Sequence, residues 1–192
     1  MTDLLATAIQ RAIDTRSQIY NRKSNCPDDK RDAELKYLYL LAEQAPDGAA
    51  AELGVRTGGS FLCWSMARDG RGPLYAVDDW SSKTRDLFFA NVAKYGVAVE
   101  TITGKSWEVA AQLETDFTFV FIDASHDTGI WLDIPAWTPK IIPDGIVAYH
   151  DYGVWKPTVN VKRAVDQWQA VARWEEIGQI GSTRAYRRPN GN

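Results

Sequence analysis

The sequence predicts an α/β fold, a Rossmann-like doubly wound sheet of seven strands that is mostly parallel and carries a C-terminal antiparallel hairpin. Short apolar segments alternate with segments of helical periodicity along most of the 192 residues. The apolar segments show no polar alternation, which is typical of parallel strands covered by helices on both faces. The last two extended segments are separated only by Gly181-Ser182, as in a hairpin.

Two helices precede the sheet and are expected within residues 1–46, with a cofactor-binding core at 47–192 of the same single domain. Pro46-Asp47-Gly48 ends the second helix. These helices either pack on their own sheet or pair in a homodimer. Their apolar stripes, at helical spacing, are Leu4, Ala8, Ile9, Ala12 and Ile13, then Leu35, Leu38, Tyr39 and Ala42.

The region that follows repeats a strand and a helix four times and then adds a fifth strand. The strands are expected at 49–54, 74–77, 98–102, 117–122 and 145–149, and the helices at 60–67, 84–94, 106–113 and 130–137. A fifth helix follows Pro157, a residue suited to a first helical turn. The hairpin is expected at 174–180 and 183–187.

The composition excludes several classes of protein. The chain is 45% hydrophobic and 11% aromatic, with a formal net charge of −3, so it can form a core but has no overall positive field for nucleic acid. No apolar run reaches the roughly 18 residues of a membrane span. We expect a cytoplasmic protein with neither a nucleic-acid nor a membrane partner. Cys26 and Cys63 are too few for a disulfide framework and are expected to be reduced.

The ligand site is expected beyond the carboxyl ends of the strands, where the winding of the sheet reverses. The first strand runs from Glu52 through Gly54, Arg56 and Gly58 to Ser60, a glycine-rich turn that opens a helix. The spacing differs from G-x-G-x-x-G, and Glu52 would repel a pyrophosphate. The turn therefore favours a cationic ligand such as S-adenosylmethionine.

A second acidic segment, Asp78-Asp79-Trp80, ends the second strand, at the spacing of a ribose-binding carboxylate. Trp80 or Trp107 is expected to cover an adenine face. Arg56 either pairs with the ligand's carboxylate or is a solvated loop arginine.

Sharper motifs follow the fourth and fifth strands, namely Asp123-Ala124-Ser125-His126 and His150-Asp151-Tyr152. With the glycine turn and Asp78, over residues 48–172, they resemble the class I S-adenosylmethionine-dependent methyltransferases. More narrowly, they are similar to the small bacterial metal-dependent O-methyltransferases of the macrocin type. The residues that we expect to bind cofactor are Glu52, Gly54, Arg56, Gly58, Ser60, Asp78, Asp79, Trp80, Ser106 and Asp123.

The resemblance implies Mg²⁺ or another divalent cation held by Asp123 and Asp151, with His126 as the general base, so that Asp123, His126 and Asp151 form the catalytic set. His150 stands where the macrocin enzymes have a carboxylate. A weaker magnesium site, a different metal and no metal are alternatives. His150 is expected to ligate the metal, to contact the acceptor or to order Asp151.

An alcohol is a poor nucleophile at neutral pH, so its proton must be removed, and imidazole titrates in that range. His150, Tyr152, Trp131 and Trp155 are candidates for the acceptor pocket, although core packing explains the aromatic residues equally well. The sequence thus predicts O-methylation of a small molecule, a sugar or polyol. The alternatives are a non-catalytic cofactor-binding module and an NAD-dependent oxidoreductase. A nucleic-acid methyltransferase ranks last, because its motifs are missing.

Overall fold

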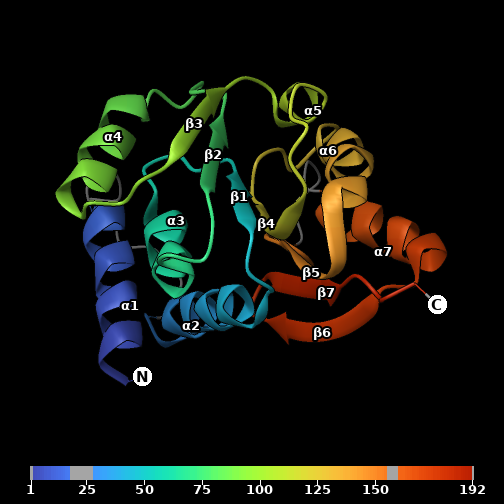
Figure 1. The fold of residues 1–192 in the computed structure, drawn as a ribbon, viewed down its shortest axis with the longest axis horizontal. Helices are drawn as coiled ribbons and strands as arrows, with labels where there is room; N and C mark the ends of the chain where they lie inside the picture. Colours follow the sequence, from blue (N-terminus) through green and yellow to red (C-terminus); the bar gives the residue numbers. More distant parts are fainter. Residues whose placement is uncertain (1, 18–27, 155–159, 192) are drawn as a thin grey trace.

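A seven-stranded sheet of order β3-β2-β1-β4-β5-β7-β6 forms the centre of the molecule (Figure 1). The computed structural model describes residues 2–17, 28–154 and 160–191. β7 runs antiparallel to both of its neighbours, and the other pairs are parallel. The winding reverses between β1 and β4, which confirms the predicted fold class. The strands are β1 (Ala49–Leu53), β2 (Leu74–Asp78), β3 (Glu100–Thr103), β4 (Phe117–Ile122), β5 (Ile141–Tyr149), β6 (Glu175–Ile180) and β7 (Thr183–Arg187).

Helices cover both faces of the sheet, so the strands are apolar on both sides (Figure 1). One face carries α1 (Thr2–Ser17), α2 (Asp28–Gln44), α3 (Gly59–Trp64) and α4 (Arg85–Lys94). The other face carries α5 (Ser106–Ala110), α6 (Ile130–Trp137) and α7 (Val161–Ala172). Two short 3-10 helices, η1 (Ser65–Arg68) and η2 (Thr138–Lys140), follow α3 and α6.

The observed bounds follow the predicted ones closely, with one informative exception. β5 begins at Ile141, four residues earlier than expected, because Ile141 is buried and pairs with Phe117. The register between β4 and β5 then shifts before Ile146 pairs with Phe119. Pro143 and Asp144 lie in this irregular segment and interrupt the apolar run, so the pattern predicts a strand only from residue 145 onward.

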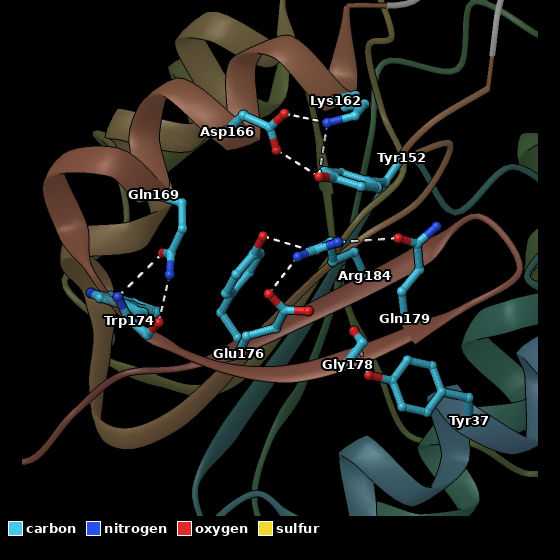
Figure 2. Close-up of polar contacts among 11 residues, drawn as sticks. Tyr37, Tyr152, Lys162, Asp166, Gln169, Trp174, Glu176, Gly178, Gln179 and Arg184 are labelled. Atoms are coloured by element: carbon cyan, nitrogen blue, oxygen red, sulfur yellow. Dashed lines mark hydrogen bonds and ion pairs between the residues drawn. The ribbon is translucent and has the colours of Figure 1, made fainter.

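The N-terminal stripes pack within the chain's own core, with α1 lying against α2 and α3 and burying its stripe incompletely. The four stripe residues of α2 are all buried. In α1 Ala8 and Ala12 are buried, but Leu4 is 59% exposed and Ile13 is 41% exposed. Tyr37 also donates from α2 to the backbone oxygen of Gly178 in β6, at 2.9 Å (Figure 2). Pairing of two chains through these helices stays a prediction.

Two further observations bear on the expectations from composition. Cys63 is a buried free thiol that packs in the core beside α2, whereas Cys26 lies outside the described residues. Among the helices of the described ranges, we find none with both the length and the apolar character that crossing a bilayer requires.

The last turn of α2 contains no basic residue. Its C-terminal carbonyls instead accept hydrogen bonds from Arg68 of η1. Arg68, which is 1% exposed, donates to the carbonyl oxygens of Ala42 (3.3 Å), Ala45 (3.1 Å) and Gly48 (2.8 Å). Burial lowers the pKa of Arg68 to about 10, so it stays charged at neutral pH. The guanidinium thus satisfies carbonyls that the end of a helix leaves unpaired and fixes the turn that leads into β1.

Replacing Arg68 by Met should therefore lower the free energy of unfolding by about 2–5 kcal/mol, since the carbonyls of Ala42 and Gly48 lose their hydrogen bonds from Arg68. The carbonyl of Ala45 keeps a hydrogen bond from Arg71. Urea unfolding followed by circular dichroism measures this loss. Arg85→Met, on the exposed side of α4, is the matched control and should change stability by less than about 0.5 kcal/mol. A loss of that small size in Arg68→Met would show that the guanidinium does not hold this end of α2.

Candidate active site

The parallel register places four site residues in one row across the sheet. Asp78 ends β2, Gly54 follows β1, Asp123 follows β4 and His150 follows β5. Backbone hydrogen bonds continue the sheet into this row. The amide of Gly54 donates to β2 at 2.7 Å, that of Asp123 to β1 at 2.9 Å and that of His150 to β4 at 3.0 Å. Residues far apart in the sequence therefore meet at the switch point between β1 and β4.

The row closes tightly around Gly54. A Cβ atom added to Gly54 would lie 2.3 Å from the backbone oxygen of Asp123, and the φ of 86° also favours glycine. Three other residues of the strand ends adopt left-handed backbone conformations, namely Arg56 (φ 49°), Trp80 (φ 57°) and Asp151 (φ 55°). Such conformations cost energy in residues other than glycine and cluster at functional sites.

A groove of about 840 Å³ lies above this row, within the usual size of a small-molecule site. Half of its twenty lining residues are ones that the sequence singled out: Gly54, Arg56, Asp78, Asp79, Ser106, Trp107, Asp123, His126, His150 and Asp151. Lys105, which is not among the predicted site residues, also lines it.

At the β2 end of the groove, Asp78 is held with its carboxylate in a fixed position. Its oxygens accept hydrogen bonds from the backbone amides of Arg56 (2.9 Å) and Trp80 (2.7 Å). Each carboxylate oxygen has a second lone pair, so Asp78 can still accept from a ligand's hydroxyl groups. Hydrogen bonds from Lys105 and from Ser81 lower the pKa of the neighbouring Asp79 to about 2.

The α5 wall of the groove depends on a buried acid that the sequence did not indicate. Ser106 donates its hydroxyl to Asp133 of α6, and Trp137 donates to the backbone oxygen of Ser106 at 3.0 Å. Asp133 is fully buried, and its second carboxylate oxygen has no hydrogen-bond partner within the described residues. Burial raises the pKa of Asp133 to about 6, against the opposing effect of Ser106.

Glu52 does not reach the groove, which corrects the expectation that its carboxylate contacts the ligand. The side chain is fully buried on the α3 side of β1. Its oxygens accept hydrogen bonds from Ser60 (2.6 Å) and Trp64 (2.5 Å), both in α3. Glu52 thus fixes the helix that the glycine-rich turn opens. Ser60 lines a small cavity beside Asp123 and His150 instead of the groove.

Two more residues of the predicted cofactor set lie outside the groove lining. Trp80 is 9% exposed and packs against Phe88, with ring centroids 5.5 Å apart, so of the two tryptophans considered only Trp107 lines the groove. Gly58 lies under the turn, where an added Cβ would be 3.0 Å from Phe88. These residues shape the loops that carry Arg56 and Asp79.

The expected aromatic wall for the acceptor is not found among the described residues. Tyr152 is buried, and its hydroxyl donates to Asp166 of α7 at 2.6 Å (Figure 2). Arg184 of β7 lies over the Tyr152 ring at 4.7 Å. Trp131 packs against the α5–α7 core. Both side chains therefore hold elements together, and Trp155 lies outside the described residues.

At the β4 and β5 end of the groove, two acids and two imidazoles form one cluster. The Nε2 atom of His126 lies 3.2 Å from an oxygen of Asp123 and 3.2 Å from an oxygen of Asp151. The Nδ1 atom of His150 lies 3.0 Å from Asp123 and 3.6 Å from Asp151. All four side chains are between 23% and 38% exposed, so the cluster faces the groove but is partly shielded from solvent.

The electrostatics of the cluster stabilise charged forms. Burial alone would raise the pKa of Asp123, but His150 and His126 more than offset it and hold that pKa well below its usual range. The hydrogen bond with Asp123 raises the pKa of His126 above its ordinary value. Burial would lower the pKa of His150, yet the charges of Asp123 and Asp151 raise it to about 9.

The donor set fits a divalent cation. One ligand atom from each of Asp123, His150 and Asp151 can be chosen so that all lie within 4.8 Å of one another. Two carboxylates and an imidazole are ligands that Mn²⁺, Zn²⁺ and related ions accept, whereas Mg²⁺ prefers oxygen alone. Mutual neutralisation with two imidazolium groups is the alternative that the geometry allows.

Comparison with known proteins agrees with this geometry. A family model described as "Methyltransferase domain" matches residues 51–152, more than half of the chain and the whole row of strand ends. The chain belongs to this methyltransferase family. A search of curated proteins gave no match.

Solved structures of methyltransferases share the fold at low sequence identity. The O-methyltransferase from Bacillus cereus in complex with SAH is 16% identical, with a TM-score of 0.70, and the match covers 94% of this chain and 90% of that one. TomG from Streptomyces achromogenes, in complex with SAM, is 19% identical over 98% and 90%, with a TM-score of 0.66. CalS11, a TDP-rhamnose 3'-O-methyltransferase, is 14% identical over 96% and 94%, with a TM-score of 0.60.

The buried Asp133 of this methyltransferase predicts a pH dependence of stability. Its folded pKa, about 6, lies above the value of about 3.8 that it has when exposed, so the folded state holds the proton more tightly and loses stability as pH rises between the two. In Asp133→Asn this contribution is missing. The free energy of unfolding of Asp133→Asn, relative to that of the wild type, should therefore rise by about 2 kcal/mol between pH 4.5 and 7.5. Urea unfolding of both proteins across that range measures it, and parallel curves would contradict the assignment.

Proposed function

We propose that this chain is an S-adenosylmethionine-dependent O-methyltransferase that acts on a hydroxyl group of a small molecule, a sugar or polyol. One observation carries the proposal. A single groove holds an ordered carboxylate suited to a ribose, Asp78, at one end and the cluster of Asp123, His126, His150 and Asp151 at the other. The neighbours crystallised with SAM or SAH support the same direction, as does CalS11, whose substrate is a nucleotide-linked sugar.

The donor end of the groove has partners for the ribose, the adenine and the carboxylate of S-adenosylmethionine. Asp78 accepts from the ribose hydroxyls, because its carboxylate lines the groove and has further lone pairs beyond the two that accept from backbone amides. Trp107 offers an aromatic face for the adenine, beside the fixed Ser106. Arg56 lines the groove and can pair with the carboxylate of the amino-acid tail.

At the other end, His126 takes the proton of the acceptor hydroxyl as the methyl group passes from the sulfonium to the acceptor oxygen. In the cluster the imidazole shares Asp123 and Asp151, whose charges favour its protonated form. A divalent cation held by Asp123, His150 and Asp151 would supply positive charge that polarises the acceptor oxygen and lowers the pKa of His126. The two aspartates orient His126 over the groove.

The remaining sequence predictions belong to this proposal. A small-molecule acceptor is its partner, with neither nucleic acid nor membrane involved, and the reaction takes place in the cytoplasm. A homodimer through α1 and α2 is the proposed assembly. A non-catalytic cofactor-binding module and an NAD-dependent oxidoreductase are the competing functions that the following experiments separate.

Binding of S-adenosylhomocysteine tests the donor end. Isothermal titration calorimetry should show binding to the wild-type chain and a 10- to 100-fold weaker affinity in Asp78→Asn, because hydrogen bonds from the ribose to a charged acceptor are lost. Asp69→Asn, an exposed acid outside the groove, is the control and should bind like the wild type. Binding of NAD without S-adenosylhomocysteine would refute the proposal.

Methyl transfer tests the acceptor end. Detection of S-adenosylhomocysteine release over a panel of sugars and polyols identifies an acceptor. In His126→Ala the kcat should then fall about 10²- to 10⁴-fold, as expected for loss of a general base. The affinity for S-adenosylhomocysteine should stay unchanged, since His126 lies at the other end of the groove. An unaltered kcat would remove the base assignment, and no turnover by the wild type with any acceptor would favour the binding module.

A further inference from the structure

A chain of hydrogen bonds links the cluster to α2, through residues that sequence reasoning did not connect with the site. The Nε2 atom of His150 lies 3.4 Å from the Oγ atom of Ser182, in the turn between β6 and β7. Ser182 in turn contacts Glu34 of α2, which accepts from the Ser182 hydroxyl at 2.9 Å and from its backbone amide. The distance from Nε2 to Oγ is at the outer limit of a hydrogen bond.

The surroundings show that this contact is built into the fold. Gly181 precedes Ser182 with a φ of 57°, and a Cβ atom there would lie 2.1 Å from the Glu34 carboxylate. Tyr37, one turn after Glu34, is bonded to the backbone of Gly178 in β6, so α2 is pinned against the hairpin at a second point as well (Figure 2). Glu34 also lines a cavity of about 10 Å³ together with Asp123 and His150.

The directions of these hydrogen bonds place a proton on the Nε2 atom of His150. A serine hydroxyl has one proton, and a carboxylate can only accept, so the proton of Ser182 belongs to Glu34. The Oγ atom must then accept from His150, which requires a proton on Nε2. Without a cation Nδ1 also carries a proton, which the Asp123 carboxylate accepts at 3.0 Å. A cation in the cluster would replace this proton, and Nδ1 would then offer its lone pair beside Asp123 and Asp151.

We propose that Glu34 and Ser182 are positioning residues that hold His150 as the Nε2–H tautomer, so that its Nδ1 completes a cation site with Asp123 and Asp151. The imidazole makes this site favour Mn²⁺ or Zn²⁺ over Mg²⁺. The inference rests on the cation of the proposed function. A ligating histidine generally donates its other N–H to a fixed acceptor, and loss of such an acceptor costs 10- to 100-fold in metal affinity.

The test is calorimetric titration of the full chain with MnCl₂, ZnCl₂ and MgCl₂, without acceptor or methyl donor. The wild type should bind Mn²⁺ and Zn²⁺ more tightly than Mg²⁺. Ser182→Ala and Glu34→Gln should each weaken Mn²⁺ binding about 10- to 100-fold. Ser182→Thr keeps the hydroxyl and should bind Mn²⁺ like the wild type. His150→Asp should bring the affinities for Mn²⁺ and Mg²⁺ closer together, because an oxygen ligand replaces the imidazole. Glu43→Gln makes the same change elsewhere on α2 and should have no effect.

Two measurements separate this role from a merely structural one. Thermal unfolding establishes that the variants are folded, and in the zinc-loaded wild type the ¹⁵N shifts of His150 should report a proton on Nε2. Unchanged Mn²⁺ affinity in folded Ser182→Ala and Glu34→Gln overturns the inference. So does a wild-type chain that binds no cation, in which case binding of S-adenosylhomocysteine by the same preparation leaves the methyl-donor proposal standing. Failure to bind S-adenosylhomocysteine sinks the proposed function whatever the metal result.

Discussion

The close approach of the ends of β1 and β4 is the constraint on which the site depends. Gly54 lies against the backbone oxygen of Asp123 so tightly that a Cβ atom would approach it to 2.3 Å. This contact keeps the strand ends in register, and the same row then presents Asp78 on one side and His150 on the other. The groups proposed to bind the methyl donor and the acceptor are thus held in fixed positions relative to each other by one edge of the sheet.

Three of the buried polar side chains around the groove stabilise the segments next to the strand ends and do not line the groove themselves. Glu52 uses both oxygens to hold α3, and Asp133 orders the α5 wall through Ser106. Arg68 closes the end of α2 against the segment that enters β1. Each of these groups is a buried ionisable side chain. Burying such a side chain costs free energy unless hydrogen bonds compensate for the lost water. Their positions indicate that they hold the segments around the groove in place.

The sequence indicated the sheet and the row of strand ends because both follow from local patterns. Apolar runs end directly before Asp123 and His150, and parallel strands bring such ends together without further information. The orientation of Glu52 left no pattern in the sequence, because β1 is buried along its whole length. Trp80 has a left-handed backbone and packs inward against Phe88, which no local pattern predicts. Contact between Glu34 and Ser182 spans 148 residues and leaves no local pattern, so sequence reasoning could not find it.

We propose that one groove binds the methyl donor at Asp78 and a cation at the cluster of acids and imidazoles. A crystal structure of the chain with S-adenosylhomocysteine and Mn²⁺, with anomalous scattering data, tests it most directly. We expect the ribose hydroxyls on the Asp78 carboxylate and a single strong anomalous peak bounded by Asp123, the Nδ1 atom of His150 and Asp151. A ribose bound away from Asp78, or manganese density only outside this cluster, would contradict the account.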